Sequence, residues 1–384
     1  MINYGKQSID QTDIKAVVDV LNSDWLTQGP KVDEFEQSLA KYFGVKYAVA
    51  VSNGTAALHL ANLAIGTDIT TNVITTPISF LATSNSVLYA GGHPVFADIS
   101  EKSFTLDPEQ VQRLVEGEIG FKGVIPVHMG GIVCDMESLK KIADENNLWI
   151  IEDACHALGG KWTDTNGKQH TVGDCSHSDM TVFSFHPVKQ VTTGEGGAIT
   201  TNNKKLYEKL LLLRTHGMTK NPEMLIENHG GWYYEMHELG YNYRMSDIQA
   251  ALGIEQLKRN NGWVKIRREL VQQYDDAFKD VENLTPQAHP DINGEYSYHL
   301  YIIQCKKRAE LYKYLKDNGV NAQIHYIPIH LQPFYKNKYG YGRGDYPVAE
   351  KYYDNALSLP LYPTLKNTEQ EKVISLVKKF YEKN

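Results

Sequence analysis

The feature that most constrains this fold is an alternation between short apolar runs and segments of helical periodicity, which continues through the first two-thirds of the chain. A strand is apolar throughout when helices cover both faces of a parallel sheet. The pattern therefore predicts an α/β fold with a mostly parallel sheet in a large domain. The predicted strands span residues 47–51, 73–76, 94–97, 123–127, 149–152, 180–185 and 197–200. The predicted helices among them span residues 10–22, 32–43, 56–63, 81–89, 108–115 and 136–146.

The rhythm changes after Leu257, where a polar helical segment leads into a more mixed pattern. We therefore predict a large domain over residues 1–257, which includes an N-terminal arm over 1–30, and a smaller C-terminal α+β domain over 258–384. Two domains suit a chain of 384 residues, since one domain usually takes about 100–200 residues. The elements predicted in the smaller domain are strands at 298–304 and 322–326, a helix at 308–318 and a helix from Glu369.

Composition excludes several classes of protein. The chain has 39 Lys and Arg against 46 Asp and Glu, a formal net charge of −7, whereas a basic nucleic-acid binder needs a surplus of cations. No apolar run reaches the roughly 20 residues that cross a bilayer, and the first residues lack the apolar region of a signal peptide. The four cysteines are scattered, unlike those of a secreted disulfide scaffold. We expect a cytoplasmic protein that binds neither nucleic acid nor membrane.

Unusual residues follow two of the first predicted strands. In open α/β sheets, ligands bind beyond the carboxyl ends of the strands. The run Ser52-Asn-Gly-Thr-Ala56 ends one strand and begins a helix, where free N–H groups and the helix dipole favour a phosphate. An ordinary capping turn has the same pattern. Phe80 follows the next strand and brings an aromatic ring near the same edge, although a lone Phe there is usually part of the core.

Two charged residues follow later strands. Glu152 and Asp153 close an apolar run, and because buried carboxylates are costly unless paired, Asp153 is expected to meet a cation or a protonated ring nitrogen. The alternative is that Asp153 only caps the next turn. Lys189 lies between two apolar runs, where desolvation would lower the pKa of its amine and make it a nucleophile toward carbonyls. A lysine, an aspartate, a phosphate cradle and an aromatic cover are together what pyridoxal phosphate requires.

Several longer runs then occur in an order typical of one enzyme family. They are Asp24-Trp-Leu-Thr-Gln-Gly29, Asn53-Gly-Thr-Ala-Ala-Leu58, Thr75-Thr-Pro-Ile-Ser-Phe80, Glu152-Asp-Ala-Cys-His-Ala157, Ser184-Phe-His-Pro-Val-Lys189, Glu195-Gly-Gly197 and Gly240-Tyr-Asn-Tyr-Arg244. With these runs the whole chain resembles the DegT-type sugar aminotransferases, fold-type I pyridoxal-phosphate enzymes that act on nucleotide-linked keto-sugars. The stretch Gln323-Ile-His-Tyr-Ile-Pro-Ile-His330 is most similar to the members of that family in the pseudaminic-acid pathway.

The resemblance implies roles for the matched residues. Lys189 would hold the cofactor and move a proton, Asp153 would pair with the pyridinium nitrogen, and His156 would lie near the phenolic oxygen. The other cofactor contacts that the resemblance implies are Gly54, Thr55, Ala56, Phe80, Ser184 and Asn242. Asn242 would reach the cofactor phosphate of the partner subunit, which implies a homodimer with shared active sites. The substrate contacts that it implies are Tyr4, Asp24, Trp25, Leu26, Thr27, Ser184, His186, Asn242, Gln323, Ile324, His325 and Tyr326.

The resemblance also implies a reaction. The amino group of L-glutamate, which leaves as 2-oxoglutarate, would be transferred to C4 of a UDP-linked 4-keto-6-deoxy-N-acetylhexosamine. The product would be UDP-4-amino-4,6-dideoxy-N-acetyl-β-L-altrosamine. The alternatives within the family are a sister enzyme that makes the D-configured UDP-4-amino sugar and one that acts on a GDP- or dTDP-linked 4-keto-6-deoxy sugar.

Three readings from other functional classes are weaker. Cys155, His156, Cys175 and His177 are residue types that bind zinc, but their spacing matches no usual zinc motif, so we expect no metal site. A dinucleotide oxidoreductase would need a G-x-G-x-x-G turn between a strand and a helix, which the sequence lacks. A binding protein without catalysis is disfavoured, because relatives of that kind lack the lysine that Lys189 provides.

Overall fold

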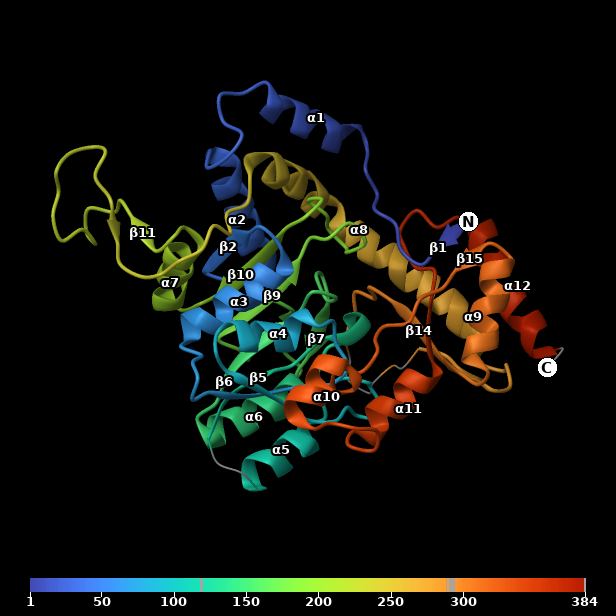
Figure 1. The fold of residues 1–384 in the computed structure, drawn as a ribbon. Helices are drawn as coiled ribbons and strands as arrows, with labels where there is room; N and C mark the ends of the chain where they lie inside the picture. Colours follow the sequence, from blue (N-terminus) through green and yellow to red (C-terminus); the bar gives the residue numbers. More distant parts are fainter. Residues whose placement is uncertain (118–119, 288, 290–293, 383–384) are drawn as a thin grey trace.

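The central sheet of the large lobe has seven strands in the computed structural model, which describes residues 1–117, 120–287, 289 and 294–382 (Figure 1). In spatial order they are β2 (Tyr47–Val51), β10 (Gly197–Thr201), β9 (Met180–Ser184), β6 (Trp149–Asp153), β5 (Phe121–Ile125), β3 (Asn72–Thr75) and β4 (His93–Phe96). β10 is antiparallel to both of its neighbours, and the pairs from β9 to β4 are parallel. The prediction of an α/β fold with a mostly parallel sheet is therefore confirmed.

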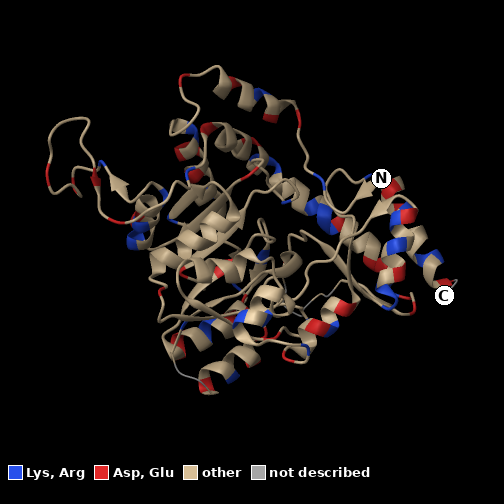
Figure 2. Cartoon of the chain, viewed as in Figure 1, with Lys and Arg blue, Asp and Glu red and all other residues tan. Residues whose placement is uncertain are grey.

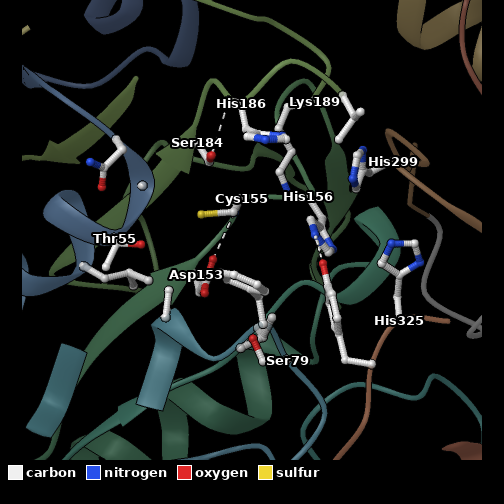
Figure 3. A pocket seen from close by; sticks show the side chains of 18 of the residues that line it. Thr55, Ser79, Asp153, Cys155, His156, Ser184, His186, Lys189, His299 and His325 are labelled. Carbon is white, nitrogen blue, oxygen red and sulfur yellow. Dashed lines mark hydrogen bonds between the residues drawn. The ribbon is translucent and has the colours of Figure 1, made fainter. Parts of the chain in front are cut away.

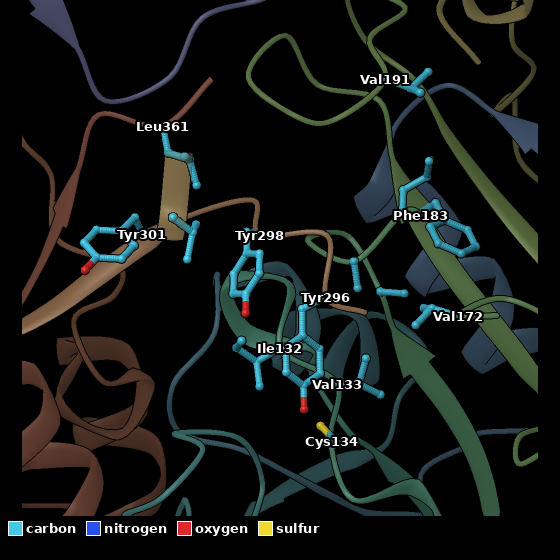
Figure 4. Packing of buried hydrophobic residues seen from close by; sticks show 14 of the residues in the cluster. Ile132, Val133, Cys134, Val172, Phe183, Val191, Tyr296, Tyr298, Tyr301 and Leu361 are labelled. Atoms are coloured by element: carbon cyan, nitrogen blue, oxygen red, sulfur yellow. The ribbon is translucent and has the colours of Figure 1, made fainter. Parts of the chain in front are cut away.

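Helices cover both faces of this sheet, which explains why its strands are apolar throughout. Val182 packs in a cluster with residues of α3 and α7. Its neighbour Phe183 packs in a larger cluster with residues of α2 and α8 (Figure 4). The helices of the large lobe are α1 (Gln11–Leu21), α2 (Pro30–Phe43), α3 (Gly54–Ile65), α4 (Ala82–Tyr89), α5 (Pro108–Gly117), α6 (Met136–Asn146) and α7 (Lys204–Arg214). Each predicted helix of this region is present, with bounds shifted by a few residues.

The helix α8 (Asp247–Phe278) connects the two lobes without a break. It begins at a capping box, in which the Ser246 side chain accepts the backbone N–H of Gln249 and the Gln249 side chain accepts that of Ser246. The predicted boundary between residues 257 and 258 lies inside α8, because the polar residues that change the sequence pattern there belong to one continuous helix. Lys258 and Lys265 on it are exposed, whereas Arg267 is buried. The lobes are joined by a helix and not by a linker.

The small lobe is built on a three-stranded antiparallel sheet, whose strands are β13 (Leu284–Thr285), β14 (Tyr301–Cys305) and β16 (Ala356–Leu359). Its helices are α9 (Arg308–Asp317), α10 (Pro333–Tyr339), α11 (Pro347–Asn355) and α12 (Asn367–Glu382). β1 (Ile2–Asn3) pairs in parallel with β15 (Val320–Asn321), so the first residues of the chain lie against the small lobe. The lobe is mixed α and β, as the sequence predicts.

The strand predicted over residues 322–326 is wrong. β15 ends at Asn321, and beyond it only an isolated bridge between Gln323 and Ser358 continues the pairing. Residues 322–326 have a strand-like apolar pattern because this irregular segment packs on the small lobe and lines the cavity described below. His325 and Tyr326 therefore look like strand residues in sequence although they lie in a loop.

The remaining elements lie outside the two main sheets. They are the pair β7 (Lys161–Thr163) and β8 (Gln169–Thr171), the pair β11 (Met218–Thr219) and β12 (Glu235–Met236), and the short 3-10 turns Met129–Gly131 and Ile329–Leu331. The chain between β11 and β12 projects from the body as an arm beyond α7 (Figure 1). Charges of both signs alternate on the outer helices α9 and α12 (Figure 2). Among the described residues, no helix is both long and apolar enough to cross a membrane.

Candidate active site

A cavity of about 840 Å³ lies between the carboxyl ends of the central strands and the small lobe. Its lining combines residues at or beyond the ends of several strands of the large lobe with two irregular segments of the small lobe (Figure 3). From the large lobe come the start of α3 after β2, Asp153 at the end of β6, and Lys189 in the turn after β9. The predicted gathering of ligand-binding residues at this edge of the sheet is therefore present.

The start of α3 forms one end of the cavity. The Asn53 side chain accepts the N–H of Ala56 at 2.8 Å and caps the helix. One of the amides expected to bind a phosphate is thus already engaged, while the Gly54 and Thr55 amides have no acceptor among the described residues. Gly54 is required because a Cβ there would lie 2.9 Å from the Cβ of Ser184. Free amides and two hydroxyl side chains therefore meet at a helix N-terminus.

Asp153 lies at the centre of the cavity and is 5% exposed. Its Oδ2 accepts the Thr83 hydroxyl at 2.7 Å, and its Oδ1 accepts the Cys155 N–H at 3.2 Å. Because Thr83 donates to Asp153, the Ser79 hydroxyl at 2.6 Å donates to Thr83. The carboxylate is held in a fixed orientation and has no cation within ion-pair distance among the described residues, so it can still pair with a ligand cation.

The neighbouring carboxylate points the other way. Glu152 accepts His128 Nε2 at 2.8 Å and the Thr181 hydroxyl at 2.8 Å, and it also accepts the Ser178 hydroxyl. Glu152 is therefore paired inside the protein, as two adjacent residues on a strand face opposite sides of a sheet. Of these two carboxylates, Asp153 is the one that faces the cavity and is available to a ligand.

The Lys189 amine faces the same cavity (Figure 3). Burial lowers its pKa to about 8, although the nearby Cys155 and Asp153 act in the opposite direction. No carboxylate forms an ion pair with Nζ in the described part of the chain. About half of this amine is therefore neutral at pH 8 and about a tenth at pH 7, and the neutral form is the one that attacks carbonyl groups.

Histidine and tyrosine side chains form the opposite side. His299 and His325 come from the small lobe, and burial is the main reason that their pKa values are lowered, to about 3 for His325. The His156 ring lies with its centroid 4.5 Å from that of His299, and burial followed by the charge of Lys189 holds its pKa well below 6.5. These rings are neutral at physiological pH, so they contribute hydrogen bonds and packing without charge.

Most of the predicted site residues line this cavity. They are Tyr4, Gly54, Thr55, Ala56, Phe80, Asp153, His156, Ser184, His186, Lys189, Gln323, Ile324, His325 and Tyr326. Asp24, Trp25, Leu26, Thr27 and Asn242 do not line the cavity of their own chain. Thr27 bridges Ser246 and Asn242 bridges Thr215, and the Trp25 side chain is 57% exposed.

The cavity also contains residues that the sequence reasoning missed. Asn53 and Cys155 lie inside sequence runs that match the family, and their position directly after a predicted strand could have identified them as cavity residues. Ser79 lies in the loop before α4, where its hydroxyl is 2.6 Å from that of Thr83, and Thr83 holds Asp153 from outside the lining. His299 had no local signal, because the contact between the two lobes brings it to the cavity.

The zinc alternative does not agree with this arrangement. Within the described ranges, no three His, Cys, Asp or Glu side chains are grouped as metal ligands. Cys175 is buried beside Thr181 and Thr200, and burial raises the pKa of its thiol to about 12. Burial also raises the pKa of the Cys155 thiol. Both thiols are therefore protonated in the metal-free protein.

A family model described as the DegT/DnrJ/EryC1/StrS aminotransferase family matches residues 7–378. The chain belongs to this family. It is a sugar aminotransferase with the fold of the type I pyridoxal-phosphate transferases, as the sequence resemblance implies.

Curated relatives in this family align with almost the whole chain. The spore coat polysaccharide biosynthesis protein SpsC of Bacillus subtilis is 39% identical over 383 residues, with 98% of this chain and 96% of the relative covered. A UDP-4-amino-4,6-dideoxy-N-acetyl-beta-L-altrosamine transaminase of Campylobacter jejuni is 39% identical over 368 residues, with 94% and 93% covered. A GDP-perosamine synthase of Caulobacter vibrioides is 32% identical over 380 residues, with 97% and 96% covered.

Solved structures of family members have the same fold. Helicobacter pylori PseC, an aminotransferase involved in the biosynthesis of pseudaminic acid, superposes with a TM-score of 0.91 at 33% identity and full coverage of both chains. The PLP form of the putative sugar aminotransferase Spr1654 of Streptococcus pneumoniae superposes with a TM-score of 0.90 at 30% identity, with 100% of this chain and 99% of that chain covered.

The family is pyridoxal-phosphate dependent, and the donor set of this cavity fits that cofactor. A phosphate needs N–H and hydroxyl donors, which the start of α3 and Ser184 supply. A protonated pyridine nitrogen needs an anion, and Asp153 is a buried carboxylate of this cavity that has no cation partner among the described residues. An aldehyde needs a neutral amine, which Lys189 provides. All three requirements are met within one cavity.

Proposed function

We propose that this family member transfers the amino group of L-glutamate to C4 of a UDP-linked 4-keto-6-deoxy-N-acetylhexosamine. The product is UDP-4-amino-4,6-dideoxy-N-acetyl-β-L-altrosamine, an intermediate of pseudaminic acid biosynthesis, and the reaction takes place in the cytoplasm. The observation that carries the transamination is the unpaired Lys189 amine in one cavity with Asp153 and the free amides of α3. The named altrosamine transaminase at 39% identity supports the choice of sugar.

In this proposal the residues of the large lobe hold pyridoxal phosphate. The amides of Gly54 and Thr55 and the hydroxyls of Thr55 and Ser184 bind the phosphate, while Asp153 keeps the pyridine nitrogen protonated. When bound, the cofactor supplies an electron-withdrawing ring that weakens the C–H bond next to the amino group. The Lys189 amine would take the proton from that carbon, hold it and return it in a later step of the transfer.

The small lobe and the N-terminal segment receive the nucleotide sugar. Tyr4 and the loop from Gln323 to Tyr326 line the open side of the cavity, where Phe80 is 57% exposed. The Phe80 and Tyr326 rings lie 6.0 Å apart between centroids. Exposed aromatic faces of this kind stack on sugar and base rings. We assign the sugar to this side of the cavity.

The active unit in this proposal is a homodimer. Trp25 and Leu26 are 57% and 45% exposed, and Trp232 and Leu239 on the arm between β11 and β12 are 75% and 77% exposed. Large apolar side chains exposed on protruding segments indicate a protein interface. The partner's cavity would then receive Asn242 and the segment from Asp24 to Thr27, none of which lines the cavity of its own chain.

The first experiment tests the transamination. The purified protein, supplied with pyridoxal phosphate, is expected to have a visible absorption band, and borohydride should fix the cofactor to the peptide that contains Lys189. Lys189→Ala is expected to lose the band and the activity, while Lys205→Ala, at an exposed position on α7, retains both. An unchanged band in Lys189→Ala would contradict the assignment.

A panel of UDP-, GDP- and dTDP-linked 4-keto-6-deoxy sugars tests the substrate, with the product configuration read by NMR. The proposal expects the UDP sugar to be aminated with L-glutamate and to give the L-altro product. Amination of the GDP sugar alone would favour the activity named for the Caulobacter vibrioides relative. A D-configured UDP product would assign the chain to the sister branch.

Sharing of the site is tested by mixing two inactive variants. If Asn242 acts across the interface, a hybrid of Lys189→Ala and Asn242→Ala chains has one site with both residues intact. Activity is expected to rise on mixing toward one quarter of wild type, the share expected for random exchange of subunits (on the order of one intact site in four). No recovery in a demonstrated hybrid would show that Asn242 is not shared.

A further inference from the structure

A chain of hydrogen bonds runs from the backbone of Gly130 through the His156 ring to the hydroxyl of Tyr326. The Gly130 N–H donates to His156 Nδ1 at 3.2 Å, and His156 Nε2 lies 3.2 Å from Tyr326 Oη. Both ring nitrogens of His156 are thus engaged by the protein. The expectation that His156 lies near the phenolic oxygen of the cofactor stays a prediction beside these contacts.

The direction of this chain follows from its first bond. A backbone N–H can only donate, so Nδ1 carries no proton and accepts. The neutral ring then has its proton on Nε2, which donates to Tyr326 Oη. The charged form of His156 would need a proton on Nδ1 and is opposed by burial and by the charge of Lys189, both of which lower its pKa.

His156 is held on all sides, so the chain is rigid. Its backbone oxygen accepts the Gln190 amide at 2.7 Å and the Ser297 hydroxyl at 3.2 Å. Its ring packs against His299 at 4.5 Å between centroids. The position of the Nε2 proton is therefore fixed before any ligand binds.

This leaves the proton of the Tyr326 hydroxyl without an acceptor. An oxygen that already accepts from Nε2–H directs its own O–H elsewhere, and no acceptor for it exists among the described residues. Tyr326 lines the cavity, and burial raises the pKa of its phenol, so the hydroxyl stays protonated. Buried hydroxyls are normally satisfied, so an unsatisfied one that faces a cavity indicates a ligand oxygen.

The neighbours of Tyr326 indicate which ligand oxygen this is. His156 and His325 lie on either side of Tyr326, and all three line the cavity that the Lys189 amine faces (Figure 3). The carbon that exchanges its amino group must lie next to that amine, because Lys189 moves its proton. In both halves of a transamination this carbon carries a carbonyl oxygen in the keto substrate or product.

We propose that Tyr326 donates its hydroxyl hydrogen to the carbonyl oxygen at the reacting carbon of the keto substrate, and that His156 positions Tyr326 for this contact. The assignment rests on the proposed transamination, but not on the identity of the sugar, since a 2-oxo acid carries the same oxygen. The hydrogen bond polarises the carbonyl and strengthens as negative charge develops on its oxygen. Tyr326 is the catalytic residue of the pair, and His156 acts through it.

The test is Tyr326→Phe, which removes the hydroxyl and retains the ring. Single-turnover rates are measured separately with the keto sugar and with the 2-oxo acid of whichever amino donor the wild type accepts. Both rates are expected to fall about 10²-fold, as when one donor to a developing oxyanion is removed. The KM values change little, and the absorption maximum of the bound cofactor stays where it is in the wild type. Tyr335→Phe, which removes a buried hydroxyl that bonds Ser84 and Asn85 away from the cavity lining, should retain wild-type rates.

His156→Phe tests the positioning role. Its single-turnover rates are expected to fall by a similar factor. The rates of the double variant with Tyr326→Phe should fall little further, because both changes act on the same hydrogen bond to the substrate. Full additivity would show that His156 acts independently of Tyr326. Thermal unfolding of each variant separates these effects from loss of the fold.

Three outcomes would overturn the proposal. A shifted absorption maximum in Tyr326→Phe would mean that the hydroxyl serves the cofactor's ring oxygen. A raised KM with an unchanged rate would mean that it binds another part of the substrate, and unchanged kinetics would mean that it binds neither. If the wild type aminates no sugar of the panel, the proposed function fails, while the rate with the 2-oxo acid still decides the role of Tyr326.

Discussion

The two sides of the cavity are held in different ways. The large-lobe side, which we call the floor, consists of Gly54–Ala56, Asp153, Ser184 and Lys189. Each of these lies at or just beyond the end of a strand in one hydrogen-bonded sheet. The small-lobe side, which we call the wall, consists of His299 and residues 323–326 in irregular segments.

The wall depends on a few individual hydrogen bonds. The Tyr352 hydroxyl donates to the backbone oxygen of His325 at 2.7 Å, and Gln323 and Ser358 exchange two backbone bonds. A floor fixed by a sheet suits chemistry shared by a whole family, since its geometry does not vary with loop sequence. A wall that is held by single contacts can change shape after few substitutions, so it is suited to determine which sugar binds.

The largest expected effect is on the floor. Asp153→Asn keeps the size of the side chain but removes the charge that keeps the pyridine nitrogen protonated. We expect kcat to fall by about 10³-fold with the cofactor still bound, which is the upper range for losing one electrostatic contact to the reacting system. Steady-state kinetics and a cofactor titration measure this, with Asp19→Asn on the exposed face of α1 as the control. A kcat within threefold of wild type would show that the charge of Asp153 is not needed to keep the pyridine nitrogen of the cofactor protonated.

The next effect concerns the space at the phosphate end of the floor. In Gly54→Ala the new Cβ would lie 2.9 Å from the Cβ of Ser184, so one of the two must move. Overpacking of this kind costs about 1–3 kcal/mol, which predicts a cofactor Kd raised about 10- to 100-fold. Fluorescence titration of the apoprotein measures the Kd. Gly262→Ala, where the added Cβ meets open space, should leave it unchanged.

The third prediction also concerns the floor and is the pH dependence of cofactor capture by Lys189. The pKa of Lys189 is lowered to about 8, chiefly by burial, so its neutral form declines as the pH falls through 8. The rate at which the apoprotein captures pyridoxal phosphate should therefore be constant above about pH 8 and fall about tenfold per pH unit below it. Stopped-flow absorbance measures this rate. A midpoint near 10.5, the ordinary value for lysine, would contradict the burial argument.

The smallest effect is expected on the wall. Ser358→Ala removes the hydroxyl that lies 2.8 Å from His325 Nδ1, a contact worth about 1 kcal/mol. We expect the KM for the sugar to rise about fivefold, with no change in the cofactor Kd, and Ser38→Ala on α2 serves as the control. A cofactor Kd that changes as much as the KM would show that floor and wall are not independent.

The floor was largely predictable from sequence, whereas the wall was not. Lys189 and Asp153 follow apolar strands, so local chemistry at strand ends identified them before any resemblance was used. Tyr326 and its neighbours entered only through the family resemblance, and their pattern was misread as a strand because enclosure in a loop and enclosure in a sheet look alike in sequence. His299 was missed because only the packing of the two lobes brings it to the cavity. Asp24–Thr27 and Asn242 remain predictions, since they concern a second chain.

The continuous helix α8 has a consequence for recombination between relatives. Its 32 residues span about 48 Å, and one apolar cluster extends from Phe35 of α2 through the sheet to Val377 of α12. A chimera joined at residue 257 would therefore splice two half-helices from different parents across a shared core. Exchanges of sugar specificity should succeed more often when wall loops are transplanted than when whole lobes are. The loops contain the residues that contact the sugar, whereas α8 packs in a core that both lobes share.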